Sequence, residues 1–128
     1  MIDTSELDEW ADVLRAAGAD AEGRGERIVS KGSLNVKNRA RDLAPKGPHT
    51  PYYAASITYD VTVKQGDIVG EVGPAHGKAQ WGLGNLLEYG SKNNAPHPHH
   101  EPALDEEEPR FYAASEQLAA DLVERWGR

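Results

Sequence analysis

Cysteine is absent from this 128-residue sequence, and its absence excludes a disulfide framework, a thiolate nucleophile and a cysteine-based zinc site. Long apolar runs are also lacking, because no stretch approaches the length needed to span a bilayer. The N-terminus shows no basic segment followed by an apolar one. We therefore expect neither secretion by a signal of its own nor membrane insertion, and a reducing cytoplasm would suit the chain.

The motifs of common catalytic and phosphate-binding sites are missing as well. The sequence has no Gly-x-x-x-x-Gly-Lys-Ser/Thr loop and no nucleophile elbow, and Gly82-Leu83-Gly84 lacks a third glycine and a preceding strand. The acids at 105–108 form one contiguous run, which offers no pair of carboxylates in a cleft for acid–base catalysis. The sequence thus predicts a protein that is not an enzyme and needs no cofactor.

The net charge of −7 is unevenly distributed. Residues 1–23 carry −6 and residues 24–46 carry +5, whereas residues 47–100 carry −1 and residues 101–128 carry −5. These blocks are either ordinary solvated helix faces or complementary patches that join copies of the chain head to tail. The basic block has no interleaved aromatic residues, so it is only a weak indication of nucleic-acid binding.

Residues 1–44 predict a helical segment in two parts. Apolar positions at intervals of three and four, after a polar start, predict a capped amphipathic helix over Ser5–Ala17 that ends at Gly18. Residues 19–25 contain two further glycines and predict a joint. A second amphipathic helix covers 26–44 and ends before a proline. The apolar positions of the first helix are Leu7, Trp10, Val13 and Leu14.

A β-hairpin is predicted in the middle of the chain. Residues 45–55 come first and form an irregular, proline-rich loop in which His49 and the following tyrosine pair are exposed. Residues 56–64 alternate apolar and polar side chains, and residues 68–73 return as a second strand after a turn at 65–67. Because an isolated hairpin is only marginally stable, we expect the helices and at least one more strand to cover its apolar face.

Residues 74–90 connect the hairpin to the rest of the chain. Trp81 either fills a space under this connection or lies exposed as an anchor at an interface. The leucines at 83, 86 and 87 predict a short helical turn or strand. Gly90 follows, where a positive φ would let the chain turn sharply.

Three prolines give the next segment a fixed backbone. Pro96, Pro98 and Pro102 each force the residue before them out of the helical region, so Glu101 is expected to be extended. Residues 91–104 are therefore predicted to form an ordered, extended arm. Such an arm loses little conformational entropy when it docks, which suits a contact between subunits.

Residues 105–128 predict a C-terminal amphipathic helix. Pro109 fits its first helical position, and the acids before it complement the positive end of the helix dipole. The predicted fold is a single α+β domain over 1–128, with N-terminal helices, an antiparallel sheet built on the hairpin, the arm and this helix.

The one candidate for metal chemistry lies in the arm, at His97, His99, His100 and Glu101. Imidazole and carboxylate groups are common ligands of zinc and similar ions. In an extended segment, however, His97 and His99 point one way and His100 the other, and the helical His-x-x-x-His spacing is missing. Two interpretations remain: a proline-rich surface arm whose histidines pack at a contact, or a small cytoplasmic metal-binding protein.

Five short motifs occur in a fixed order along the chain. They are Ala44-Pro45, Thr50, Ser56-Ile57, Glu88-Tyr89-Gly90-Ser91 and Pro98-His99-His100-Glu101-Pro102-Ala103. In this order and spacing the chain resembles the tail-completion or neck proteins of long-tailed double-stranded DNA bacteriophages, which are also described as head–tail joining or minor tail proteins. The resemblance covers most of the chain.

The resemblance implies a structural virion protein of the head–tail junction that is assembled in the host cytoplasm. Such a subunit belongs to a homo-oligomeric ring, usually a hexamer, between the head-side connector and the tail-tube or tail-terminator protein. DNA passes through the lumen without specific binding. The residues expected at contacts between subunits are Glu88, Tyr89, Gly90, Ser91, Pro96, Pro98, His99, His100, Pro102 and Ala103.

Overall fold

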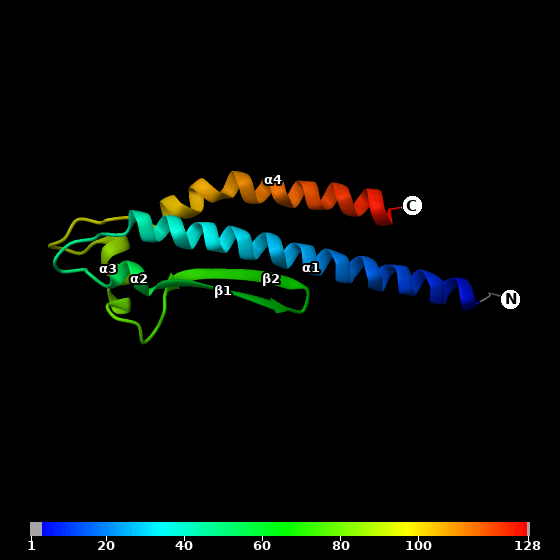
Figure 1. The fold of residues 1–128 in the computed structure, drawn as a ribbon, viewed down its shortest axis with the longest axis horizontal. Coiled ribbons are helices and arrows are strands. Elements are labelled where there is room, and N and C mark those ends of the chain that lie inside the picture. Colours follow the sequence, from blue (N-terminus) through cyan, green and yellow to red (C-terminus); the bar gives the residue numbers. More distant parts are fainter. Residues whose placement is uncertain (1–3, 128) are drawn as a thin grey trace.

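The computed structural model describes residues 4–127, apart from the side chains of residues 4–7 and 10. Its elements, in order, are α1 (Thr4–Leu43), α2 (Tyr53–Ser56), β1 (Ile57–Lys64), β2 (Asp67–Pro74), the 3-10 helix η1 (Trp81–Leu83), α3 (Gly84–Tyr89) and α4 (His100–Trp126). Figure 1 shows α1 between α4 on one side and the hairpin on the other. The predicted α+β class is confirmed.

Helix α1 is continuous over 40 residues, so the predicted break at Gly18 and joint at 19–25 are wrong. Each glycine costs a helix about 1 kcal/mol relative to alanine, but two of them allow close packing. A Cβ on Gly25 would lie 2.9 Å from Cδ1 of Ile68, and one on Gly32 would lie 3.3 Å from the Phe111 ring. The hairpin and α4 therefore pack closely on α1, and this tertiary contact outweighs the low helix propensity. The predicted packing of Leu7 and Trp10 lies outside the described side chains.

The hairpin forms as predicted, with β1 and β2 antiparallel and Lys64 opposite Asp67. Gln65 and Gly66, the two residues between the strands, both have positive φ, 53° and 84°. This is the geometry of a type I′ turn, whose twist matches that of the strands. The turn is thus one residue shorter than predicted.

The predicted third strand is wrong, because the sheet of residues 4–127 has only β1 and β2. Helix α1 covers the hairpin instead. Gly70 lies so close to Val29 and Ser33 that a Cβ there would collide with both side chains. At the first residue of β1, Arg41 Nε donates a hydrogen bond of 2.8 Å to the Ile57 carbonyl. The predicted cover by a helix is therefore confirmed, whereas the additional strand is absent from the sheet of residues 4–127.

The proline-rich loop after α1 is irregular, as predicted, up to the single turn of α2. Lys46 Nζ donates to the carbonyls of Arg41 (2.6 Å) and Asp42 (2.7 Å), which lack helical partners at the end of α1. Tyr52 is exposed, but Tyr53 is fully buried, so its predicted exposure is wrong. The turn of α2 directs Tyr53 and Ser56 to the interior.

Helix α4 begins at His100, five residues before the predicted helical segment 105–128, and includes the end of the predicted arm. The extended part of that arm lies before His100, and Glu101 is helical rather than extended. Pro102 is tolerated in the first turn, where its missing N–H would have had no helical partner. Pro109 lies inside the helix and leaves the carbonyl of Asp105 without its helical donor.

Helices α1 and α4 run antiparallel (Figure 1). Polar side-chain contacts join them. Two of these contacts are ion pairs between the basic block 24–46 and the acidic block 101–128. The complementary charges therefore meet within one chain, which accounts for part of the charge pattern without a second copy. The contacts are Arg39–Glu106 (2.7 Å), Asn35–Glu107 (3.0 Å), Arg24–Asp121 (2.7 Å) and Asp20–Trp126 (2.9 Å).

The buried core lies at the end of the molecule far from both termini. It consists of Val36, Ala40, Ala44, Tyr53, Ile57 and Ala103. At the other end, the start of α1 extends past the last residues of α4 (Figure 1). Residues 4–19 of α1 precede Asp20, the first residue of α1 whose described side chain bonds to α4. We call this segment the overhang; its Val13 and Leu14 side chains are exposed. None of the described helices is long and apolar enough to cross a membrane.

Candidate functional site

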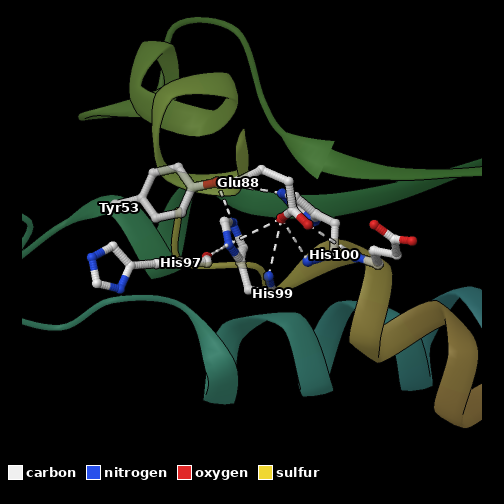
Figure 2. Close-up of polar contacts among 6 residues, drawn as sticks. Tyr53, Glu88, His97, His99 and His100 are labelled. Carbon is white, nitrogen blue, oxygen red and sulfur yellow. Dashed lines mark hydrogen bonds and ion pairs between the residues drawn. The ribbon is translucent and has the colours of Figure 1, made fainter. Parts of the chain in front are cut away.

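The most densely bonded site lies between α3 and the start of α4, where Glu88 is buried (Figure 2). Its Oε1 accepts the backbone N–H groups of His99 (3.0 Å) and His100 (2.9 Å), and its Oε2 accepts that of Glu101 (3.3 Å). The first N–H groups of a helix have no partner within the helix and carry its positive partial charge. Glu88 therefore caps α4 from a different helix.

A sharp turn after α3 brings the start of α4 onto Glu88. Gly90 has a φ of 75°, and a Cβ there would lie 2.7 Å from the Asn94 carbonyl oxygen, so glycine is required. Ser91 and Asn94 then pair as an isolated β-bridge. The N–H of His97 donates to the Leu87 carbonyl at 2.7 Å, which fastens the extended segment against α3.

His99 is fully buried and joins Glu88 to Tyr53. Its Nδ1 lies 3.1 Å from Glu88 Oε1 and 2.9 Å from the His97 carbonyl oxygen. Both are acceptors, so the hydrogen-bond network assigns a proton to Nδ1. Nε2 of the neutral ring is then an acceptor, and it lies 2.6 Å from the Tyr53 hydroxyl, which donates to it.

His100 lies beside His99, with ring centroids 4.2 Å apart. Its Nε2 is 3.3 Å from the same Tyr53 hydroxyl. Because the hydroxyl proton is directed to His99, the His100 Nε2–H donates to the hydroxyl oxygen. His100 Nδ1 is buried and has no hydrogen-bond partner among the described residues.

The electrostatics of the site follow from burial and from these bonds. Burial alone would raise the pKa of Glu88, but the backbone hydrogen bonds from His100, His99 and Glu101 lower it overall. Burial, together with the nearby Glu88 carboxylate, raises the pKa of Tyr53 to about 12. Burial also lowers the pKa of His100, helped by His99 and opposed by Glu88. At neutral pH the site therefore holds a charged Glu88 and a protonated tyrosine hydroxyl.

The structure divides the ten predicted contact residues into three groups. Glu88, His99 and Ala103 are buried, and their contacts lie within the chain. Gly90, His100 and Pro102 are partly buried. The exposed residues are Tyr89, Ser91, Pro96 and Pro98.

Sequence reasoning missed Tyr53. The signal was present, because Tyr53, Ser56 and Ile57 stand at helical spacings of three and four, and all three are buried. The period-two pattern of the strand was extended back to Ser56, and this obscured the helical turn.

The residues proposed as metal ligands are not brought together as a set. His97 and Glu101 are exposed, whereas His99 and His100 approach Glu88, with one potential ligand atom from each of the three within 4.8 Å of the others. The prediction that His99 and His100 point in opposite directions is wrong, because α4 begins at His100.

The Tyr53 hydroxyl group contacts the Nε2 atoms of both His99 and His100. The Glu88 oxygens are engaged by three backbone N–H groups (Figure 2). A metal ion would have to displace the tyrosine and compete with the helix cap. The arrangement is therefore typical of a hydrogen-bonded structural network that fixes the start of α4.

Comparisons with protein-family models, with curated proteins and with solved structures each gave no match for this chain. The family resemblance therefore rests on the sequence motifs alone.

Proposed function

We propose that this chain is a structural protein of a bacteriophage head–tail junction. In this proposal it is a neck or tail-completion subunit, and copies of it form a ring, expected to be hexameric, that joins the head-side connector to the tail tube. The ring belongs to the virion, and DNA passes through its lumen without specific binding.

The observation that carries the proposal is the cap that Glu88 forms on α4. Glu88 belongs to the motif Glu88–Ser91, and the N–H groups that it accepts belong to the motif Pro98–Ala103. The two longest motifs of the resemblance are thus bonded to each other, although they are separate in the sequence. This mutual dependence is a physical reason for the two motifs to occur together in one chain.

The cap also determines which motif residues are available to a neighbour. Tyr89 is 73% exposed, and Pro96 and Pro98 are exposed in the extended segment before α4. Since this segment is fixed at both ends, little entropy would be lost when a second copy contacts it. We propose the exposed residues as the contact with a neighbouring subunit, while buried Glu88 and His99 act by holding the segment in place.

Exposed apolar surface elsewhere is consistent with a subunit of an assembly. The overhang carries Val13 at 47% and Leu14 at 72% exposure. Exposed apolar side chains that gather on one surface are typical of protein–protein contacts. An overhang that a single chain leaves without cover would be covered in a ring.

Immunogold electron microscopy of purified virions of the source virus tests the proposed location. An antibody against the chain should label the junction between head and tail. Absence of the chain from purified virions, or label only at another position, would overturn the proposal.

The matched variants Pro98→Gly and Pro48→Gly test the contact between subunits, because both prolines are exposed but only Pro98 lies in the proposed contact. Only Pro98→Gly should reduce incorporation into virions.

A further inference from the structure

A groove lies between β2 and α4, with α1 as its floor and α3 at one end. Its volume is about 940 Å³. The floor is made of small or β-branched residues of α1, namely Val29, Gly32, Ser33 and Val36. Six residues of β2 line the groove, and β1 contributes none. We call it the β2–α4 groove.

Large apolar side chains that a single chain leaves exposed gather in the β2–α4 groove. Trp81 is 39% exposed, and Tyr112 on the opposite wall is 59% exposed. Val69 and Leu104 add further apolar surface. Tryptophan and tyrosine are enriched among the residues that dominate binding energy at protein interfaces. The groove therefore has the composition of a protein-binding site.

The charge of the groove favours a basic occupant. Four glutamates line it and no lysine or arginine does. Two of them, Glu88 and Glu107, are buried, and Arg110 Nη2 lies 2.7 Å from Glu107. The other two, Glu101 and Glu108, are exposed on the first turns of α4. An occupant with lysine or arginine at its rim would meet complementary charge.

The wall formed by β2 offers free backbone groups. A two-residue turn makes Lys64 and Asp67 the first hydrogen-bonded pair of the hairpin, and such pairs alternate along antiparallel strands. By this alternation Ile68, Gly70 and Val72 direct their N–H and C=O groups away from β1. Among residues 4–127, no hydrogen bond to these groups is found. Because β1 lies on the other side, this free edge faces the groove.

We propose that the β2–α4 groove binds an extended, basic segment of a partner protein, which adds a third strand along the free edge of β2. Free strand edges commonly recognise extended peptides in this way. Alternate apolar side chains of the segment lie on the α1 floor and against Trp81 and Tyr112, and its lysines or arginines lie near Glu101 and Glu108. The proposal does not depend on the proposed function, because it rests only on the register, the lining and the charge of the groove.

A second copy of this chain is a less suitable occupant. Its unpaired overhang belongs to the block 1–23, which carries −6 and would be repelled by the glutamates of the groove. Its β1 strand carries one acid and one lysine and is therefore neutral. The basic block 24–46 is helical and already packed against α4.

Selection from a library of short random peptides, with the full chain as bait, tests the class of partner. The expected result is enrichment of peptides that alternate apolar and other residues and are rich in lysine and arginine. When the best peptide is added to the isotope-labelled chain, the amide protons of Ile68, Gly70 and Val72 should gain protection from exchange with solvent. No enrichment, or enrichment of acidic peptides, would overturn the proposal.

Two versions of the selected peptide, N-methylated on alternate residues, test backbone pairing without any change to the protein. Only one alternate set of N–H groups can face β2. Methylation of that set should reduce affinity by at least about tenfold, whereas methylation of the other set should have little effect. Equal effects, or protection of the same three amides by self-association of the free chain, would contradict the proposal.

The charge of the partner is tested by the double variant Glu101→Gln and Glu108→Gln. Both side chains are exposed, so the fold should be retained. Affinity for the selected peptide should fall about three- to tenfold at low salt, and the difference should shrink as salt is raised. The matched control is Glu116→Gln and Glu124→Gln, exposed positions on α4 that do not line the groove. An equal loss in the control would count against the assigned role of Glu101 and Glu108.

Discussion

The Glu88 carboxylate, near the end of α3, accepts the backbone N–H of His100, the first residue of α4, at 2.9 Å. The two residues are twelve apart in sequence and are joined across a sharp turn at Gly90. This bond and its two neighbours fix where α4 begins and hold the extended segment against α3.

Glu88→Gln should reduce the free energy of unfolding by about 2 kcal/mol, because the substitution removes the charge at the positive end of α4 and one of two acceptor oxygens. Urea denaturation measures the change. Glu101→Gln is the matched control, since its side chain is exposed while its backbone N–H still bonds to Glu88. Equal stability of the Glu88 variant and the wild type would contradict the role of the cap.

Stability should decline in two stages as pH is lowered. The folded-state pKa of His100 is depressed, so its contribution is fully present above the unfolded-state value of about 6.5 and is lost as pH falls through the folded-state pKa. The pKa of Glu88 is also depressed, and its contribution is lost in the same sense below about 4.3. Urea denaturation over a pH series should show both stages. The variant His100→Asn should lack the first stage of this decline. Persistence of that stage in the variant would refute its assignment to His100.

Tyr53 should ionise late in an alkaline titration. Its pKa is raised to about 12, chiefly by burial and further by Glu88, against an ordinary value of about 10. Ultraviolet absorbance of tyrosinate, followed in an alkaline titration, should show one late step that disappears in Tyr53→Phe. The stability that Tyr53 contributes is present below about pH 10 and is lost as pH rises through 12. A single step near pH 10 for all five tyrosines would contradict the buried hydroxyl.

Gly70→Ala should destabilise the fold by about 2 kcal/mol, because the added Cβ would collide with the Ser33 and Val29 side chains of α1. Ser33→Gly makes room for that Cβ. The double variant should therefore lose less stability than the sum of the two single variants, by at least about 0.5 kcal/mol in a double-mutant cycle. Strict additivity would show that the hairpin does not pack on α1 at this point.

The parts of the fold that could be predicted depend on local patterns. The alternation in β1 and the Gln65-Gly66 turn specify the hairpin, because side-chain period and turn conformation are properties of adjacent residues. The break predicted at 19–25 was wrong because the contact between Gly25 and Ile68 joins segments far apart in sequence. Helix propensity depends on the residue type alone and contains no information about such packing.

The candidate site was predicted only in part, for the same reason. The motif around Glu88 and the cluster at His99 and His100 were recognised as important, but not as partners of one another. Local rules require an extended residue before Pro102, whereas the distant Glu88 carboxylate stabilises a helix there. Local spacing could indicate that Tyr53 is buried, but not its role in the site, because its hydrogen-bond partners lie 46 and 47 residues away.

Native mass spectrometry of the purified chain, with and without added zinc, distinguishes a ring subunit from a metal-binding protein, because one spectrum reports both stoichiometry and bound metal. We predict a metal-free ring of six copies, formed by the chain alone or on addition of the connector or tail-tube protein. A chain that remains monomeric under all these conditions, or that binds stoichiometric zinc lost in the variant His99→Ala and His100→Ala, would contradict it.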